Sequence, residues 1–103
     1  MKRVFVSVPM TGRKYEDIIA DIEKAKKEYC KAHPNETVCF VHNYSDEDIA
    51  GYVHPELYYL GQAIQKMGTC DEVIYCGNVG ISRGCTVEML VDQLYFSRHE
   101  QTS

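Results

Sequence analysis

Three short runs of apolar residues stand out along the chain, and each has the composition of a buried β-strand. The runs are dense in valine, isoleucine, phenylalanine and tyrosine, which are favoured on pleated surfaces. The first run ends at Pro9, a residue that cannot donate to a strand ladder. The predicted strands cover residues 3–8, 37–41 and 72–76.

Between and after these runs, apolar residues recur at intervals of three and four, the spacing of one helix face. The first such stretch ends near Pro34, the second has Pro55 in its first turn and stops at Gly68, and the third begins near Gly84. The periodic apolar residues are Tyr15, Ile18, Ile19, Ile22, Ala25, Tyr29 and Cys30, then Leu57, Leu60, Ile64 and Met67, and finally Val87, Leu90, Val91, Leu94 and Tyr95.

The alternation of three strands with three helices predicts one α/β domain over residues 1–103. Right-handed crossovers between parallel strands place helices on both faces of the sheet, so we expect a three-layer sandwich with a short parallel sheet of strand order 2-1-3. Ligands of such sheets bind beyond the carboxyl ends of the strands. A site is therefore expected among residues 9–13, 42–52 and 77–84.

Composition and charge limit the classes of partner. The chain has 103 residues, of which 45% are hydrophobic and 25% charged, as in a soluble globular domain that folds without a structural metal or disulfides. Fifteen acidic against eleven basic residues give a net charge of -4, which argues against a general attraction to nucleic acid or anionic lipid. We expect a small-molecule ligand, with no nucleic-acid polymer and no membrane as partner.

The cysteines and histidines show no metal-ligand spacing, so no metal is expected. The five cysteines are odd in number, scattered and free of a CxxC pair, which argues against a disulfide framework. The apolar run from Val4 to Pro9 is too short for a signal-peptide core or a membrane span. We therefore expect a cytoplasmic protein with reduced thiols.

Glu88 is the first candidate for chemistry, because it lies at the edge of the apolar stripe of the last predicted helix. A carboxylate there can act on a ligand at the strand ends as a nucleophile or a general base. The alternative is a glutamate that only interacts with the helix dipole. Spacing alone does not choose between these interpretations.

The segment before that helix has the ingredients of an anion site. Residues 80–86 supply hydroxyls, the guanidinium of Arg83 and free backbone N–H groups at a helix start. In the alternative interpretation Ser82 is an ordinary N-cap and Gly84 a turn residue. The loop at residues 9–12 has neither a Walker lysine nor a GxGxxG pattern, which argues against the standard nucleotide-binding motifs.

Two further features leave alternatives open. Asp71 precedes the third strand, where it either orients a ligand or is a solvated residue at a strand start. The acidic loop at residues 46–48 and the tyrosines Tyr52, Tyr58 and Tyr59 either line a base pocket or belong to a solvated face and the core.

Three segments carry a family resemblance: VFVSVPMTG at residues 4–12, YYLGQAIQKMGTCDEVIYC at residues 58–76, and above all GISRGCTVE at residues 80–88. Together they resemble the nucleoside 2-deoxyribosyltransferase-like family, over nearly the whole chain and most closely its small single-domain branch. The resemblance implies a Rossmann-like fold. It also implies cleavage of the N-glycosidic bond of deoxynucleosides or their 5′-monophosphates through a covalent glycosyl-glutamate, without a cofactor.

The resemblance also assigns roles to residues. In the family a Ser or Asp stands six residues before the nucleophilic Glu, and a Gly stands two residues after that Ser or Asp. Ser82, Gly84 and Glu88 match this spacing. It makes Glu88 the nucleophile and Ser82 a ligand or phosphate contact beside Arg83. The loop that closes over sugar and base runs from Pro9 through Met10 and Thr11 to Gly12, and Ser7 is a further substrate-binding residue.

One departure keeps two functions open. Family members carry an acidic residue in the helix before the third strand, whereas residues 59–62 here are Tyr-Leu-Gly-Gln. The chain is therefore expected to be a deoxyribosyltransferase or N-glycosidase, or alternatively a non-catalytic nucleotide-binding module on the same fold. An enzyme also needs an acid for the leaving base, for which Asp71, Asp92 and the tyrosines are candidates.

A sheet of three strands with three helices leaves apolar surface uncovered in so short a chain. We therefore expect a homodimer or a higher homo-oligomer.

Overall fold

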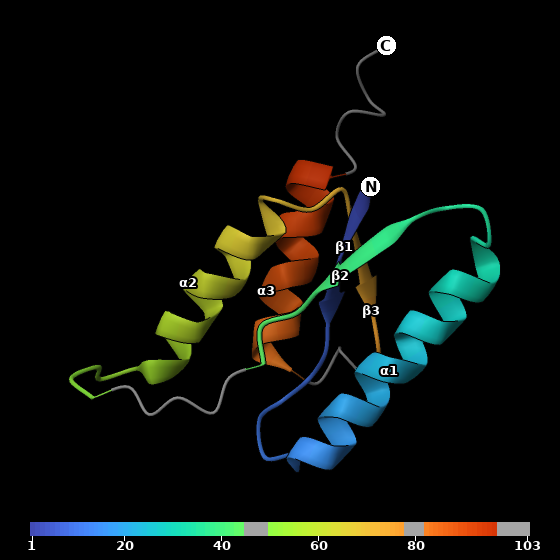
Figure 1. Ribbon diagram of the computed structural model, residues 1–103. Coiled ribbons are helices and arrows are strands. Elements are labelled where there is room, and N and C mark those ends of the chain that lie inside the picture. Colours follow the sequence, from blue (N-terminus) through green and yellow to red (C-terminus); the bar gives the residue numbers. More distant parts are fainter. Residues whose placement is uncertain (45–49, 78–81, 97–103) are drawn as a thin grey trace.

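The computed structural model describes residues 1–44, 50–77 and 82–96, and it shows a sheet with helices on both faces (Figure 1). All strand pairs are parallel, and the order β2-β1-β3 confirms the predicted order 2-1-3. The elements are β1 (Lys2–Ser7), α1 (Tyr15–Ala32), β2 (Val38–Val41), α2 (Pro55–Met67), β3 (Glu72–Tyr75), α3 (Arg83–Val91) and the π-helical turn η2 (Asp92–Phe96). The acidic loop at residues 46–48 and the first two residues of the predicted anion segment, at 80–81, lie outside the described residues.

The sheet separates two apolar cores, so the predicted three-layer α/β architecture is confirmed. Val6 packs with Ile18 of α1 on one face, and Phe5 packs with Met67 of α2 on the other. Figure 1 shows α1 on one side of the strands and both α2 and α3 on the opposite side. Because side chains alternate along a strand, Ser7 points to the same face as Phe5, toward α2 and α3.

β1 is the central strand and the most deeply buried one. Val4, Phe5 and Val6 are each at most 1% exposed, because β2 and β3 pair with both edges of β1 and helices cover both faces. This explains why the strand is a nearly continuous apolar run rather than an alternating one. Its carboxyl end, at Ser7, is therefore held firmly in place.

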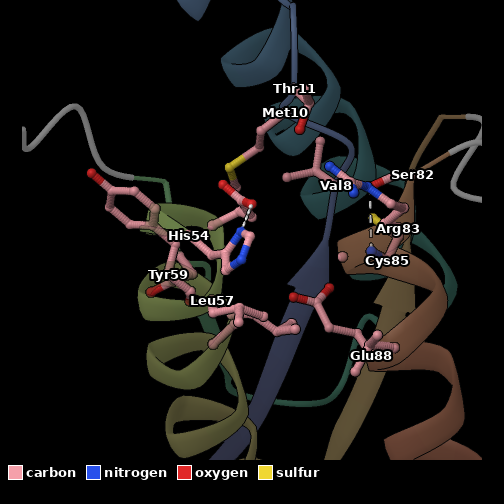
Figure 2. A pocket seen from close by; sticks show the side chains of 16 residues that line it. Val8, Met10, Thr11, His54, Leu57, Tyr59, Ser82, Arg83, Cys85 and Glu88 are labelled. Carbon is pink, nitrogen blue, oxygen red and sulfur yellow. Dashed lines mark hydrogen bonds and ion pairs between the residues drawn. The ribbon is translucent and has the colours of Figure 1, made fainter. Parts of the chain in front are cut away.

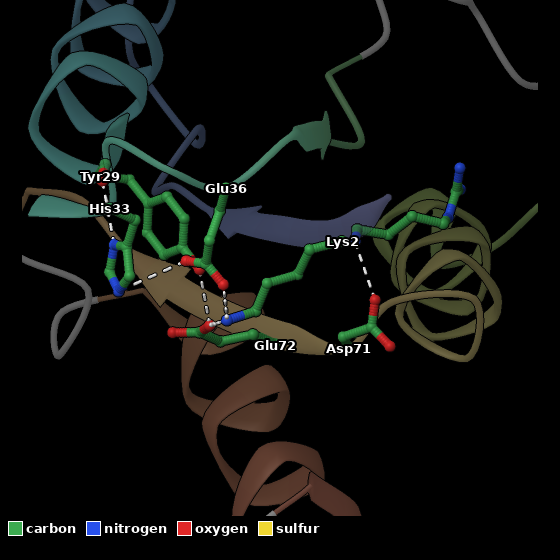
Figure 3. A network of polar contacts seen from close by, with 7 residues as sticks. Lys2, Tyr29, His33, Glu36, Asp71 and Glu72 are labelled. Carbon is green, nitrogen blue, oxygen red and sulfur yellow. Dashed lines mark hydrogen bonds and ion pairs between the residues drawn. The ribbon is translucent and has the colours of Figure 1, made fainter. Parts of the chain in front are cut away.

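Polar contacts join the amino ends of the strands to α1 (Figure 3). Lys2 Nζ lies 2.9 Å from Glu72 Oε1, and the Tyr29 hydroxyl of α1 donates to the same oxygen at 2.9 Å. The backbone N–H of Arg3 donates to Asp71 Oδ2 at 2.8 Å. These contacts hold the end of the sheet that lies opposite the strands' carboxyl ends.

Candidate functional site

A cavity of about 640 Å³ lies between α2 and α3, beyond the carboxyl end of β1 (Figure 2). Its walls come from the segment after β1, from Asn43 after β2, from His54 and α2 as far as Ala63, and from the first two turns of α3. The residues that were predicted from the sequence and line it are Met10, Thr11, Ser82, Arg83, Gly84 and Glu88. The cavity occupies the position where ligands of parallel α/β sheets bind.

Glu88 is a buried carboxylate at this cavity. It is only 8% exposed, and its Oε1 accepts a hydrogen bond of 2.6 Å from the Ser7 hydroxyl. Burial raises the pKa of Glu88 above its ordinary value, and the hydrogen bond from Ser7 opposes part of that rise. No lysine or arginine of the described residues forms an ion pair with Glu88.

The start of α3 forms the wall next to Glu88. Ser82 is the N-cap of the helix, since its Oγ accepts the backbone N–H of Cys85 at 3.3 Å. The capping interpretation of Ser82 is therefore confirmed, and Ser82 lines the cavity as well. The helix N-terminus and the exposed Arg83 give this wall a positive potential, which favours an anionic or hydroxyl group of a ligand.

The turn after β1 is held by Arg13. Its guanidinium donates to the Pro9 carbonyl at 2.9 Å and forms an ion pair of 2.7 Å with Asp21. Gly12 adopts a positive φ of 73°, the left-handed conformation that glycine tolerates best. This leaves Met10 and Thr11 on the cavity wall, whereas Pro9 is buried and neither Pro9 nor Gly12 lines the cavity.

Gly77, after β3, lies next to Asp21, the ion-pair partner of Arg13 in this turn. Replacing Gly77 by alanine is expected to lower the free energy of unfolding by about 1–2 kcal/mol. Its φ is 71°, and a Cβ there would lie 3.3 Å from Oδ2 of Asp21, the partner of Arg13. Urea unfolding measures the effect. Gly61→Ala is the matched control, because a Cβ at that exposed helical position meets nothing within 4 Å and is expected to stabilise the fold. Equal stability of Gly77→Ala and the parent chain would contradict the prediction.

Ser7 has a different place from the one expected for a substrate-binding residue. It is 1% exposed, and its hydroxyl lies against the Glu88 carboxylate rather than on the cavity wall. Its contact in this structure is therefore with the candidate nucleophile.

The structure does not bring the acid candidates Asp71 and Asp92 to the cavity. Asp71 precedes β3 and accepts the backbone N–H of Arg3 at the amino end of the sheet, opposite Glu88. Asp92 lies in η2 and accepts the Tyr75 hydroxyl at 2.5 Å. Of the acids considered from the sequence, Tyr59 is the one that lines the cavity.

Asn43 lines the cavity within the predicted segment 42–52, whereas His54 and Glu56 are polar residues of the cavity that the sequence analysis missed. Asn43 is 8% exposed; its Nδ2 donates to the Tyr59 carbonyl at 2.7 Å, and its Oδ1 has no hydrogen-bond partner among the described residues. At the start of α2, His54 Nδ1 lies 3.6 Å from Glu56 Oε1. The sequence signal was the His-Pro-Glu triplet, which had been interpreted only as a helix start.

Comparison of the chain with models of known families, with curated proteins and with solved structures found no match. Within residues 1–44, 50–77 and 82–96, no helix has the length and apolar character that crossing a bilayer requires. The same described residues contain no group of three or more histidine, cysteine, aspartate or glutamate side chains placed to hold a metal ion.

Proposed function

We propose that the protein cleaves the N-glycosidic bond of nucleosides or nucleotides, with Glu88 as the nucleophile. The observation that carries the proposal is the position of Glu88, an 8% exposed carboxylate on a ligand-sized cavity with one neutral hydrogen-bond donor. Burying a carboxylate without a cation is costly for the fold. A helix-dipole partner needs no such burial, so the arrangement favours a carboxylate that acts on a ligand.

In the proposed reaction, one oxygen of Glu88 attacks the anomeric carbon while the C1′–N bond breaks. The base leaves with the bonding electron pair, and a glycosyl ester remains on Glu88. Water or a second base then attacks the same carbon and regenerates the carboxylate. Ser7 holds the other oxygen of Glu88, which directs the carboxylate for attack.

The cavity walls suit the two parts of a nucleotide. Arg83 and the N-terminus of α3 offer a guanidinium and backbone N–H groups to a phosphate or a sugar hydroxyl. Met10, Leu57 and Tyr59 offer apolar and aromatic surface to a base. The ligand class that fits both walls is a nucleoside or its 5′-monophosphate.

Chromatography of a panel of deoxynucleosides and their 5′-monophosphates tests the proposal. We expect free base to accumulate with the protein. The mass of protein quenched during turnover is expected to increase by one deoxyribosyl group, located on the peptide that contains Glu88. Absence of base release from every member of the panel would overturn the proposal.

The second candidate function is a nucleotide-binding module without catalysis. It is favoured by residues 59–62 of α2, Tyr-Leu-Gly-Gln, where family members carry an acidic residue; the carboxylate that α2 does bring to the cavity, Glu56, lies one turn earlier. Saturable binding of a nucleotide without base release or a glycosyl-protein adduct would support this function instead.

We also propose that the chain self-associates, and light scattering at micromolar concentration is expected to give at least twice the chain mass. Leu90, Leu94 and Tyr95, along α3 and η2, are each more than half exposed, an unusual exposure for large apolar side chains on consecutive helical turns. A scattering mass near 11.8 kDa would contradict the prediction.

A further inference from the structure

The start of α2 places a histidine–carboxylate pair on the wall that faces Glu88. His54 Nδ1 lies 3.6 Å from Glu56 Oε1, and both residues line the cavity that Glu88 lines from α3. Figure 2 shows His54 and Glu88 on the two opposing walls. A ligand that fills the cavity therefore meets the pair and the carboxylate from opposite sides.

Glycosidic cleavage needs a proton donor on the side of the base, because an ordinary nucleobase leaves poorly as an anion. Besides Glu88, the described residues of the cavity wall whose side chains can act as proton donors include His54, Glu56, Tyr59 and Cys85. Burial raises the pKa of the Cys85 thiol, which makes the thiol a weaker acid. Of the remaining side-chain types, histidine is the one that most often serves as general acid and base in enzymes.

We infer that His54 is the proton donor to the departing base, an inference that rests on the proposed function. The proton moves from His54 to a ring nitrogen or exocyclic oxygen of the base as the C1′–N bond breaks and the bond between C1′ and the Glu88 oxygen forms. In the second half, the neutral imidazole takes a proton from the attacking water. The C1′–O bond to Glu88 then breaks and the carboxylate is restored, so protons and electron pairs balance over the cycle.

Glu56 is a positioning residue in this arrangement. Its Oε1 lies 3.6 Å from Nδ1 of His54, and in the proposed reaction the carboxylate favours the protonated imidazole while Nε2 faces the base. A carboxylate that orients an imidazole is the usual second partner of a histidine acid or base.

Local structure alone gives little reason for the pair. His54 is the N-cap of α2, but its side chain makes no capping hydrogen bond. Both side chains are more than half exposed, and exposed ion pairs add little to stability. The helix start therefore does not depend on the imidazole, which makes His54→Asn a conservative variant, since asparagine is a favourable N-cap.

The test compares base release from two matched pairs of 2′-deoxynucleoside 5′-monophosphates. In one pair the base is guanine in one nucleotide and N7-methylguanine in the other, and in the second pair it is uracil and 5-nitrouracil. N7-methylguanine and 5-nitrouracil leave without being protonated. We expect His54→Asn to slow release of guanine or uracil by roughly 10²–10⁴-fold and to leave release of N7-methylguanine or 5-nitrouracil within about threefold. Glu56→Gln is expected to show the same selectivity with a smaller loss.

Controls separate this inference from the proposed function. His33→Asn, the same substitution at the far end of α1, is expected to change no rate, and circular dichroism checks that α2 is retained in His54→Asn. The role of His54 would be overturned if His54→Asn slowed release of both bases of a pair equally, or of neither. It would also be overturned if the parent chain released only N7-methylguanine and 5-nitrouracil. In each case Glu88 would stay essential. A parent chain that releases none of the four bases above the spontaneous rate would overturn both proposals.

Discussion

Replacing Glu88 by glutamine is expected to abolish base release while leaving the fold intact. The amide keeps the size and shape of the carboxyl group and still accepts the Ser7 hydroxyl, but it is no nucleophile. Loss of a covalent nucleophile lowers kcat by about 10⁴-fold or more in comparable systems. Nucleotide binding is expected to persist, because the amide removes a negative charge from a cavity that would hold an anionic ligand.

The same substitution is expected to stabilise the protein by about 0.5–2 kcal/mol at neutral pH. Glu88 is 8% exposed, and its pKa is raised by burial, so the folded state is destabilised whenever the carboxyl is ionised. Below the pKa of the unfolded chain both states are protonated and the penalty is absent. As the pH rises through the higher pKa of the folded state, the parent chain loses stability that Glu88→Gln does not lose.

Urea unfolding of the two proteins in mildly acid and in weakly alkaline buffer measures this difference. We expect the advantage of Glu88→Gln to grow with pH. Glu23→Gln, at an exposed position of α1, is the matched control and is expected to change neither base release nor the pH dependence of stability. Full activity in Glu88→Gln would leave Glu88 without a catalytic role, and a pH-independent stability difference would argue against a buried ionisable carboxylate.

The order of the strands could be predicted because the relevant signals are local. Residues 3–8 form an apolar run, the stretch after Tyr15 has helical spacing, and right-handed crossovers then allow few arrangements. The rule that ligands lie beyond the strands' carboxyl ends also pointed to Met10, Thr11 and Ser82. Those parts of the site follow a strand directly, so chain order is enough to locate them.

The residues on the α2 wall could not be predicted in the same way. His54 and Glu56 belong to a helix start, and which face of α2 meets the cavity depends on how the helix packs against Phe5 and Met67. Asp71 was a candidate from the sequence that the structure places elsewhere. It directly precedes β3 and therefore lies at the amino end of the parallel sheet, away from the cavity.

The contact between Ser7 and Glu88 joins residues that are 81 positions apart, and no local pattern indicates it. The contact has two independent causes. Side chains alternate along β1, which points Ser7 toward the face that α3 covers, and Glu88 lies on the turn of α3 next to the end of β1. In this fold the hydroxyl of Ser7 is the donor to the carboxylate that the family resemblance assigned to catalysis.

Ser7→Ala is therefore expected to affect both stability and activity. Removing the hydroxyl leaves the buried carboxylate without its 2.6 Å donor, which is expected to lower the free energy of unfolding by about 1–3 kcal/mol at neutral pH. The pKa of Glu88 is expected to rise further, because the hydrogen bond is what opposes the effect of burial. A smaller fraction of the protein then carries an ionised nucleophile, so base release falls most strongly in acid buffer.

A double-mutant cycle that combines Ser7→Ala with Glu88→Gln measures how much more strongly Ser7 stabilises the carboxylate than the amide at position 88. Ser7 is 1% exposed, so part of the effect of Ser7→Ala comes from altered packing, and that part is the same whether residue 88 is glutamate or glutamine. We expect a coupling free energy of about 1–3 kcal/mol above the pKa of Glu88, and a smaller one in acid, where the carboxyl is neutral in every member of the cycle. Strict additivity at both pH values would mean that Ser7 stabilises the carboxylate no more than it stabilises the amide. The pKa of Glu88 would then be set by burial without help from the hydroxyl of Ser7.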